Sequence, residues 1–172
     1  MGQLTAPNLR AAVLADASSL AAVSLEVWFA TYIHHGINAP FADFALAHFT
    51  PKLFRNWIGD PDHHLIVSQN RDGIDGFIHI DENSADPVNG TVSTEIASLY
   101  VQPRHQGRGL GGALLQAVLD RAGGQVWLAV NSENTKARAF YGAHDFTKLG
   151  ESGFKIGDES YPNDILTRAP LR

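Results

Sequence analysis

The sequence predicts an α/β domain built on a central, twisted, mixed β-sheet of the α+β type with flanking helices. Strand-like and helix-like patterns alternate along the 172 residues, and no repeat or long linker interrupts them. A hydrophobic content of 44% is enough for a core without metals or cross-links. The length fits a single domain over residues 1–172.

In the first half, apolar runs and breakers set the expected elements. Asp16 is a good N-cap for a helix that ends by His35 and Gly36. Pro51 suits a helix start. The expected elements are a strand at 9–13, the helix after Asp16, short helices at 43–49 and 51–58, strands at 64–68 and 74–80 joined as a hairpin, and a polar loop at 81–90.

The second half alternates more regularly. A β-branched and aromatic run at 94–101 predicts a strand, and the apolar spacing after Gly109 predicts a helix. The remaining expected elements are a strand at 126–130, a helix at 135–144, and late strands at 146–149 and 164–168.

Composition excludes several classes of chemistry and partner. The chain has no cysteine, which rules out disulfides, thiolate zinc sites and a cysteine acyl-enzyme. A net charge of −5 disfavours a nucleic-acid partner. The first residues, Met1–Thr5, lack the basic and apolar pattern of a leader, and no run is apolar enough to span a membrane. We therefore expect a cytoplasmic protein with neither a nucleic-acid nor a membrane partner.

The segment Gln106-Gly107-Arg108-Gly109-Leu110-Gly111-Gly112 is the strongest functional signal. It lies between the strand at 94–101 and an apolar helix, so its glycines stand at a helix start. The first amides of a helix have no internal acceptor, and glycines let an anion approach them closely. Arg104, His105 and Arg108 add positive charge. This arrangement predicts a site for a pyrophosphate.

Two interpretations of this segment compete. Gly107-x-Gly109-x-x-Gly112, with Glu133 about 20 residues on, matches a dinucleotide fingerprint. That fingerprint requires the turn to follow its strand directly, whereas here residues 102–106 intervene and include Pro103. Read instead as Gln106-x-x-Gly109-x-Gly111 after Leu99-Tyr100-Val101-x-Pro103, the segment resembles the acetyl-coenzyme A (acetyl-CoA) loop of the GCN5-related N-acetyltransferase (GNAT) family.

A second segment is also similar to this family. The segment Asn134-x-x-Ala137-x-x-Phe140-Tyr141, followed by Phe146, resembles a second pattern of the family. This chain departs from that pattern at one position, where Asp145 replaces the usual glycine. The resemblance implies the GNAT fold, in which neighbouring parallel strands, here near 95–101 and 126–130, splay apart around the pantetheine arm. It implies acetyl-CoA as cosubstrate, with no metal. The implied cofactor-binding residues are Leu99, Tyr100, Val101, Gln106, Gly107, Arg108, Gly109, Leu110, Gly111, Gly112, Asn134, Ala137 and Tyr141.

The resemblance also implies two catalytic residues. An amine acceptor with a pKa near 10 must lose a proton before it attacks. Glu95, eleven positions before Gln106 as in one branch of the family, is the candidate base, and strand alternation puts it on one face with Ala97, Leu99 and Val101. The competing interpretation of Glu95 is an ordinary solvated charge at a strand end. Rival bases are His79, Asp81, Glu82, His34 and His35.

Tyr141 is the candidate acid for the departing thiolate, and Asn134 would bind the pantetheine arm. Structural roles compete with both: Tyr141 as an aromatic anchor of its helix, and Asn134 as an N-cap. The amide at Val101 would polarise the thioester carbonyl.

Substrate and metal contacts are less defined. Trp28, Tyr32 and His79 are the candidate substrate residues, with core packing the alternative for the aromatic ones. Adjacent histidines, as at His34-His35, cannot chelate from one element, so no metal is expected.

The expected partner is an amine acceptor, either a small molecule or a protein. A homodimer is also expected, because family members are often dimers. Two other functions stay open: a non-catalytic acyl-CoA sensor, and a dinucleotide-dependent oxidoreductase.

Overall fold

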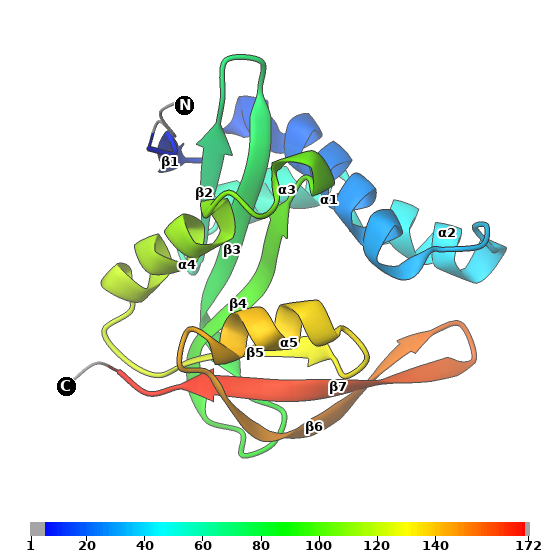
Figure 1. Ribbon diagram of the computed structural model, residues 1–172, viewed down its shortest axis with the longest axis vertical. Helices are drawn as coiled ribbons and strands as arrows, with labels where there is room; N and C mark the ends of the chain where they lie inside the picture. Colours follow the sequence, from blue (N-terminus) through cyan, green and yellow to red (C-terminus); the bar gives the residue numbers. More distant parts are fainter. Residues whose placement is uncertain (1–5, 171–172) are drawn as a thin grey trace.

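The computed structural model describes residues 6–170 and shows a seven-stranded mixed sheet of order β1-β2-β3-β4-β5-β7-β6 (Figure 1). The strands are β1 (Leu9–Ala11), β2 (His63–Gln69), β3 (Ile74–Ala85), β4 (Val92–Val101), β5 (Val126–Asn131), β6 (Thr147–Ile156) and β7 (Glu159–Arg168). The helices are α1 (Ala17–Tyr32), α2 (Ala39–His48), α3 (Pro51–Gly59), α4 (Leu110–Arg121) and α5 (Thr135–Gly142), with short 3-10 turns η1 (Leu14–Asp16) and η2 (Pro103–His105). The expected mixed sheet with flanking helices is confirmed.

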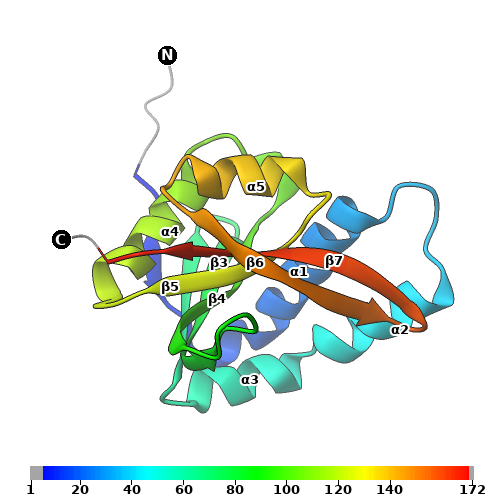
Figure 2. The ribbon, with the colours of Figure 1, turned by 90° about the horizontal axis from the view of Figure 1, so that it is seen from below.

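Helices cover both faces of the sheet. α4 and α5 lie on one face, whereas α1 and α3 lie on the other, and α2 extends toward the β6–β7 hairpin (Figure 2). Each face has its own apolar core. Leu114 and Leu115 of α4 are fully buried against β3 and β5, and Leu20 of α1 and Phe54 of α3 pack against Phe77 of β3.

Several expected boundaries were wrong. The expected loop at 81–90 begins later, because β3 continues to Ala85 and pairs with the start of β4. The late strands are longer than expected, since β6 and β7 pair with each other over nearly their whole length. α2 begins at Ala39, where Asn38 accepts a hydrogen bond from the Phe41 amide. Long-range pairing and capping decided these ends.

Asp16 precedes α1 as expected, but its side chain does not cap the helix. The carboxylate accepts hydrogen bonds from Arg10 at 2.7 and 2.9 Å and from the Val13 amide at 2.8 Å. It therefore joins β1 to η1, and the strand ends at Ala11 rather than at Val13.

β4 and β5 are the central feature of the sheet for function. They are parallel neighbours, yet only Thr94–Val126 and Glu95–Trp127 pair between them. Beyond these pairs the two strands diverge, with β3 on the far side of β4 and β7 on the far side of β5. The splay expected near 95–101 and 126–130 is therefore present.

A β-bulge at Ala97 changes which side chains of β4 share a face. His79 pairs with Ser98, but the next residue of β3, Ile80, pairs with Ile96, so Ala97 is extra. The expected alternation, which grouped Glu95 with Leu99 and Val101, is wrong. Leu99 and Val101 pack in the core with α4, and Glu95 lies on the opposite face, with Ser98 and Tyr100.

Asp145, which stands where glycine is usual in the family pattern, still adopts the backbone conformation of the turn. Asp145 has φ of 65° and is the one non-glycine residue with positive φ in the described range 6–170. Asp tolerates this left-handed conformation better than most residues with a Cβ, which accounts for its use where glycine is usual.

No helix within residues 6–170 is both long and apolar enough to cross a membrane. The expectation about a leader concerns Met1–Thr5, which lie outside the described residues.

Candidate active site

A cavity of about 750 Å³ opens beside the splayed strands. Ala97, Ser98 and Tyr100 of β4 line it, together with Ala129 and Asn131 of β5. α1, α2, α3, the start of α5, β6 and β7 complete the walls. The cavity therefore runs along the gap between the two strands, between elements from both halves of the chain.

The glycine-rich loop meets the first requirement for an anion site. Among the described residues, no carbonyl or side chain accepts a hydrogen bond from the amides of residues 107–112. Gly107 and Gly109 have φ of 73° and 81°, which favours glycine at both positions. These amides stand at the start of α4 and remain available to a pyrophosphate.

Side chains brace this loop from two sides. The side-chain amide of Gln106 donates from Nε2 to the Val101 carbonyl at 2.9 Å, and its Oε1 accepts a hydrogen bond from Lys136 of α5 at 2.5 Å. His105 lies 3.9 Å from Asp75, so its ring is turned toward a carboxylate of β3. Arg104 and Arg108 are exposed beside the loop. Lys136, which the sequence did not single out, adds positive charge near the loop.

The edge of β4 that faces β5 is not paired with β5 beyond Glu95, and on it the Val101 carbonyl is occupied by the Gln106 side chain. The Gln102 amide bonds to the Asp75 carbonyl, which makes that pair a hydrogen-bonded one. Hydrogen-bonded and non-hydrogen-bonded pairs alternate along an antiparallel ladder, so Val101 and Leu99 belong to non-hydrogen-bonded pairs with β3. Their backbone N–H and C=O groups therefore point away from β3, into the gap. The predicted backbone partners of a pantetheine arm therefore lie where an extended ligand could pair with them.

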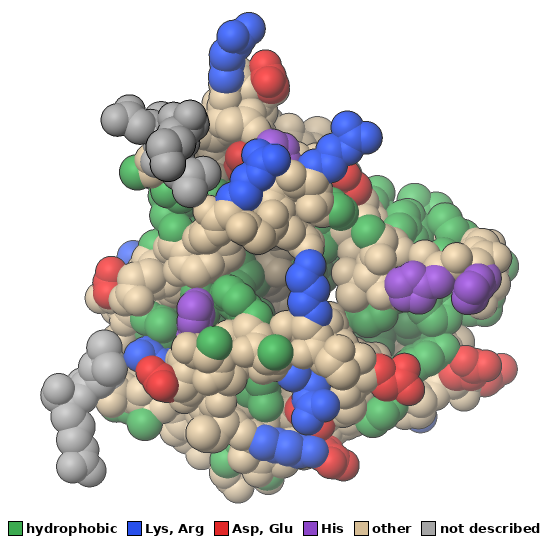
Figure 3. Space-filling view, viewed as in Figure 1, with side chains coloured by type: hydrophobic (Ala, Val, Ile, Leu, Met, Phe, Trp, Pro, Cys, Tyr) green, Lys and Arg blue, Asp and Glu red, His purple; other side chains and the backbone are tan. Residues whose placement is uncertain are grey.

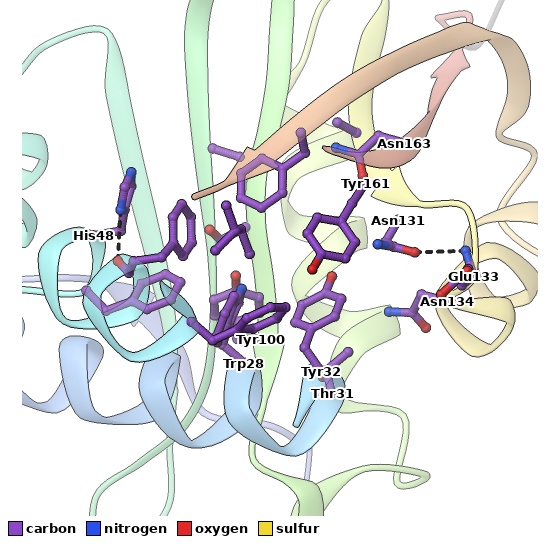
Figure 4. A pocket seen from close by; sticks show the side chains of 18 of the residues that line it. Trp28, Thr31, Tyr32, His48, Tyr100, Asn131, Glu133, Asn134, Tyr161 and Asn163 are labelled. Carbon is purple, nitrogen blue, oxygen red and sulfur yellow. Dashed lines mark hydrogen bonds between the residues drawn. The ribbon is translucent and has the colours of Figure 1, made fainter. Parts of the chain in front are cut away.

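Asn134 takes the capping role. Its side chain accepts from the Ala137 amide at 3.1 Å at the start of α5. Asn134 also lines the cavity, close to Tyr32 at the end of α1 (Figure 4). The two roles considered for Asn134 are therefore compatible, and Ala137 is half-buried against the core beneath it.

All four tyrosines of the chain gather at this site. Tyr32, Tyr100 and Tyr161 line the cavity, and the hydroxyl groups of Tyr32 and Tyr161 point toward each other across it (Figure 4). Tyr141 does not line the cavity but is buried next to it. Burial raises the pKa of Tyr141, and the nearby Tyr100 and Tyr32 raise it further. Its phenol therefore holds its proton at neutral pH.

Glu95 lies at the closed end of the splay, where β4 and β5 still pair. It is half-buried and accepts a hydrogen bond from the Ser84 hydroxyl at 2.6 Å. Burial raises the pKa of Glu95, with a contribution from Asp81, while Ser84 and His63 oppose the increase. The bulge at Ala97 brings this carboxylate to the face that also carries the cavity residue Ser98.

The rival bases are separated by their surroundings. Glu82 and His64 bond to Arg121 on the other side of β3, away from the cavity. His34 lines the cavity, while His35 is exposed outside it. Asp81 of β3 is paired with Glu95 of β4 and is therefore the alternative base that lies nearest to Glu95.

His79 is not in the cavity wall. It is 3% exposed, packs against Trp57 at 4.6 Å, and its Nε2 lies 2.9 Å from His63 Nδ1. Burial and the neighbouring His63 lower the pKa of His79 to about 3. This ring is neutral at pH 7 and is covered by Trp57, which itself lines the cavity.

The adjacent histidines His63 and His64 do not point toward a common site. His63 turns toward His79, and its neighbour His64 turns toward Glu82 and Arg121. Within the described part of the chain, no group of three His, Asp or Glu side chains could hold a metal ion.

The sequence missed most of the aromatic side of the cavity. Trp28 and Tyr32 line it as expected, but the same wall includes Phe41, Phe44, Phe49, Phe154 and Tyr161. The clustering of phenylalanines between residues 41 and 54 was a usable signal. The contribution of β6 and β7 was not visible, because it depends on how their hairpin folds over α2.

Comparisons with known proteins agree with this geometry. The model of the acetyltransferase (GNAT) family matches residues 30–146. An uncharacterised N-acetyltransferase of Mycobacterium tuberculosis is 25% identical over 159 residues, covering 90% of this chain and 98% of that protein. The N-alpha-acetyltransferase RimI of the same organism is 31% identical over 101 residues, covering 58% of this chain and 62% of RimI.

Solved structures share the fold. The PaiA N-acetyltransferase of Thermoplasma acidophilum, in complex with coenzyme A, has a TM-score of 0.74 at 16% identity, covering 96% of this chain and 99% of its own. The yncA protein of Salmonella typhimurium, solved with acetyl-CoA, has a TM-score of 0.67 at 19% identity, covering 98% and 96%.

These findings overturn the dinucleotide interpretation. A dinucleotide fold needs a parallel sheet with the glycine turn directly after its strand. Here η2 separates β4 from the loop, and β4–β5 is the one parallel pair among the described strands. The loop, the splayed strands and the matched family model lead to one conclusion: the chain belongs to the GNAT acetyltransferase family and is an acetyl-CoA-dependent N-acetyltransferase.

Proposed function

We propose that the protein transfers the acetyl group of acetyl-CoA to a primary amine by direct attack in a ternary complex. The observation that carries this proposal is the combination of free amides at 107–112 with a splayed, unpaired edge of β4. The loop would hold the pyrophosphate, and the backbone of Leu99 and Val101 would pair with the pantetheine amides. Both cosubstrates would then meet in one cavity.

Glu95 is the proposed base. An alkylammonium with a pKa near 10 must lose its proton before its nitrogen attacks the thioester carbon. A carboxylate with a raised pKa is a better acceptor for that proton than an ordinary one, and Glu95 has the burial that produces this change. His79, with its pKa of about 3, is a much weaker base.

Tyr141 is the proposed acid. When the bond between the carbonyl carbon and sulfur breaks, the leaving thiolate takes a proton. The Tyr141 phenol keeps its proton at neutral pH because it is buried. The Val101 amide would polarise the carbonyl oxygen during attack. Since cysteine is absent from the chain, an acyl-cysteine intermediate plays no part.

The acceptor, location and assembly are also proposals. RimI is named as an N-alpha-acetyltransferase, and another relative, 35% identical over 118 residues, as an aminoglycoside N(6')-acetyltransferase of Stenotrophomonas maltophilia. Those names support an amine acceptor, small or protein-borne. A cytoplasmic location, a homodimer and the lack of a nucleic-acid partner stay predictions.

Two measurements on the same preparation test the proposal. Calorimetric titration should show binding of acetyl-CoA, and free thiol should appear when a panel of primary amines is added. Tyr141→Phe should lower kcat while the acetyl-CoA Kd is unchanged. Binding without thiol release from any amine would favour the sensor function, and absence of binding would overturn the transferase.

A further inference from the structure

One end of the cavity is an aromatic wall built from distant segments. We use this term for Trp28, Phe41, Phe44, Phe49, Phe154 and Tyr161. Trp28 stacks on Phe44 with centroids 5.4 Å apart, and Phe44 meets Phe154 edge-on at 5.0 Å. Phe41 contacts Tyr161 at 5.8 Å. In the space-filling view, hydrophobic side chains gather over α2, which carries two of these rings (Figure 3).

Charged groups are scarce in the cavity. Among the described residues that line it, Glu133 is the one carboxylate, and it precedes α5, away from α2. Lys136 is bonded to Gln106, and the His48 ring bonds to the Phe44 carbonyl at 2.9 Å. The aromatic wall itself contains no charged side chain, and one carboxylate borders it in an exposed position: Glu159 accepts a hydrogen bond from the Tyr161 hydroxyl at 2.6 Å.

This charge pattern discriminates between amine classes. Polyamines and aminoglycosides carry several ammonium groups, and each additional one needs a carboxylate when it leaves water. An amino acid would need a cation for its carboxylate. The aromatic wall offers no cation, and Glu159 at its exposed edge is a single carboxylate rather than the several that a polyamine or aminoglycoside needs.

The wall suits a flat apolar group. Aromatic rings prefer stacked or edge-on neighbours at 4.5–7 Å and bury large areas, on the order of 150–250 Å² each. The same ring faces attract a single ammonium. The Tyr32 and Tyr161 hydroxyl groups point toward each other beside the wall (Figure 4). The Tyr161 hydroxyl donates its proton to Glu159, so the Tyr161 oxygen and the Tyr32 hydroxyl remain to bond one amine.

We propose that the acceptor is a small arylalkylamine: one primary amine on a short chain that ends in an uncharged aromatic ring. The ring lies against the aromatic wall and the nitrogen is directed toward Ser98 and the splayed strands. This inference rests on the proposed transferase function and narrows its substrate class.

The test compares acceptors in the thiol-release assay. 2-Phenylethylamine and tryptamine are measured against butylamine, spermidine, kanamycin and a peptide with a free N-terminus. The expected kcat/KM for the two arylalkylamines exceeds that for butylamine by roughly tenfold to a hundredfold, as expected for one additional apolar group in a fitted pocket. Equal or higher kcat/KM for spermidine, kanamycin or the peptide would overturn the proposal.

Two variants show where the preference arises. Phe44 and Phe29 are both half-buried and both contact the Trp28 ring, at 5.4 and 5.7 Å, but only Phe44 lines the cavity. Phe44→Leu should reduce the ratio of phenylethylamine to butylamine kcat/KM about tenfold. Phe29→Leu should leave the ratio unchanged. An equal loss in both variants would assign the effect to general packing.

Direct binding separates this inference from the transferase function. Phenylethylamine, spermidine and acetyl-CoA are each titrated into the wild-type protein by calorimetry. Phenylethylamine binding that Phe44→Leu weakens would support the ligand class even if acetyl-CoA failed to bind, in which case the transferase proposal alone would fall. Acetyl-CoA binding with no preference for phenylethylamine would overturn the ligand class alone.

Discussion

The two ends of the candidate active site, the glycine-rich loop and the aromatic wall, are built by different means. The loop at 106–112 offers backbone amides, whose arrangement depends on two glycines with positive φ and on a helix start. The aromatic wall offers side chains from α1, α2, β6 and β7, held by contacts among themselves. A backbone site leaves a local sequence signature, whereas a side-chain site assembled from four elements leaves only a partial one, such as the phenylalanines clustered between residues 41 and 54. The contrast predicts that the two ends respond to different mutations.

Glu95→Gln tests the proposed proton transfer and alters neither end of the site. Of the changes considered, it should reduce kcat the most. Removing a general base costs about 10² to 10⁴ in kcat. Binding of acetyl-CoA and of the acceptor should persist, because the side chain keeps its shape. The wild-type rate should rise with pH above the usual range of a glutamate, since the pKa of Glu95 is raised. The variant should lack this rise.

Asp81→Asn is the matched control. Asp81 raises the pKa of Glu95, so its loss should move the rising limb of the pH–rate profile to lower pH and leave kcat nearly intact. A loss of kcat as large as that of Glu95→Gln would make Asp81 the base instead.

Gly109→Val should damage only the backbone end. Gly109 has φ of 81°, and a left-handed conformation costs a residue with a Cβ roughly 1–2 kcal/mol. The acetyl-CoA Kd should rise about tenfold, while direct binding of the amine is unchanged. Gly123→Val is the control, because Gly123 has open space around it and no positive φ. Equal effects of both changes on Kd would contradict the role of the loop.

Burial of His79 behind Trp57 should make the stability of the folded protein sensitive to acid. Its pKa is about 3 in the folded chain and near 6.5 in an unfolded one. The unfolded state therefore binds a proton first as the pH falls. The free energy of unfolding should decrease below pH 6.5, by up to about 1.4 kcal/mol per pH unit, until the pH nears 3.

Urea unfolding across this range checks the prediction. His79→Gln should remove that part of the pH dependence, and His35→Gln, at an exposed position, should preserve it. An unchanged pH profile in His79→Gln would place the acid sensitivity elsewhere.

Asn38→Ala should have the smallest effect and act on the aromatic end. The Asn38 side chain caps α2, which carries Phe41 and Phe44, and loss of such a cap costs about 1 kcal/mol. The acceptor KM should rise by a small factor, with the acetyl-CoA Kd unchanged. A change in Kd without one in KM would show that the two ends are coupled.

Local patterns in the sequence correctly predicted the sheet, most of the helices, the glycine-rich segment at a helix start and the family. These follow from local rules: glycines at a helix start, apolar periodicity and an N-cap at Asn134. Asp145 fits the same logic, because one backbone angle decides which residue is tolerated there.

Which side chains meet depends on contacts between segments that are distant in the chain. The bulge at Ala97 is a property of the pairing between β3 and β4, and it moved Glu95 to the opposite face from Leu99 and Val101. The aromatic wall required the β6–β7 hairpin to reach α2. Strand register and long-range packing depend on partners far away in the chain, so no local pattern encodes them.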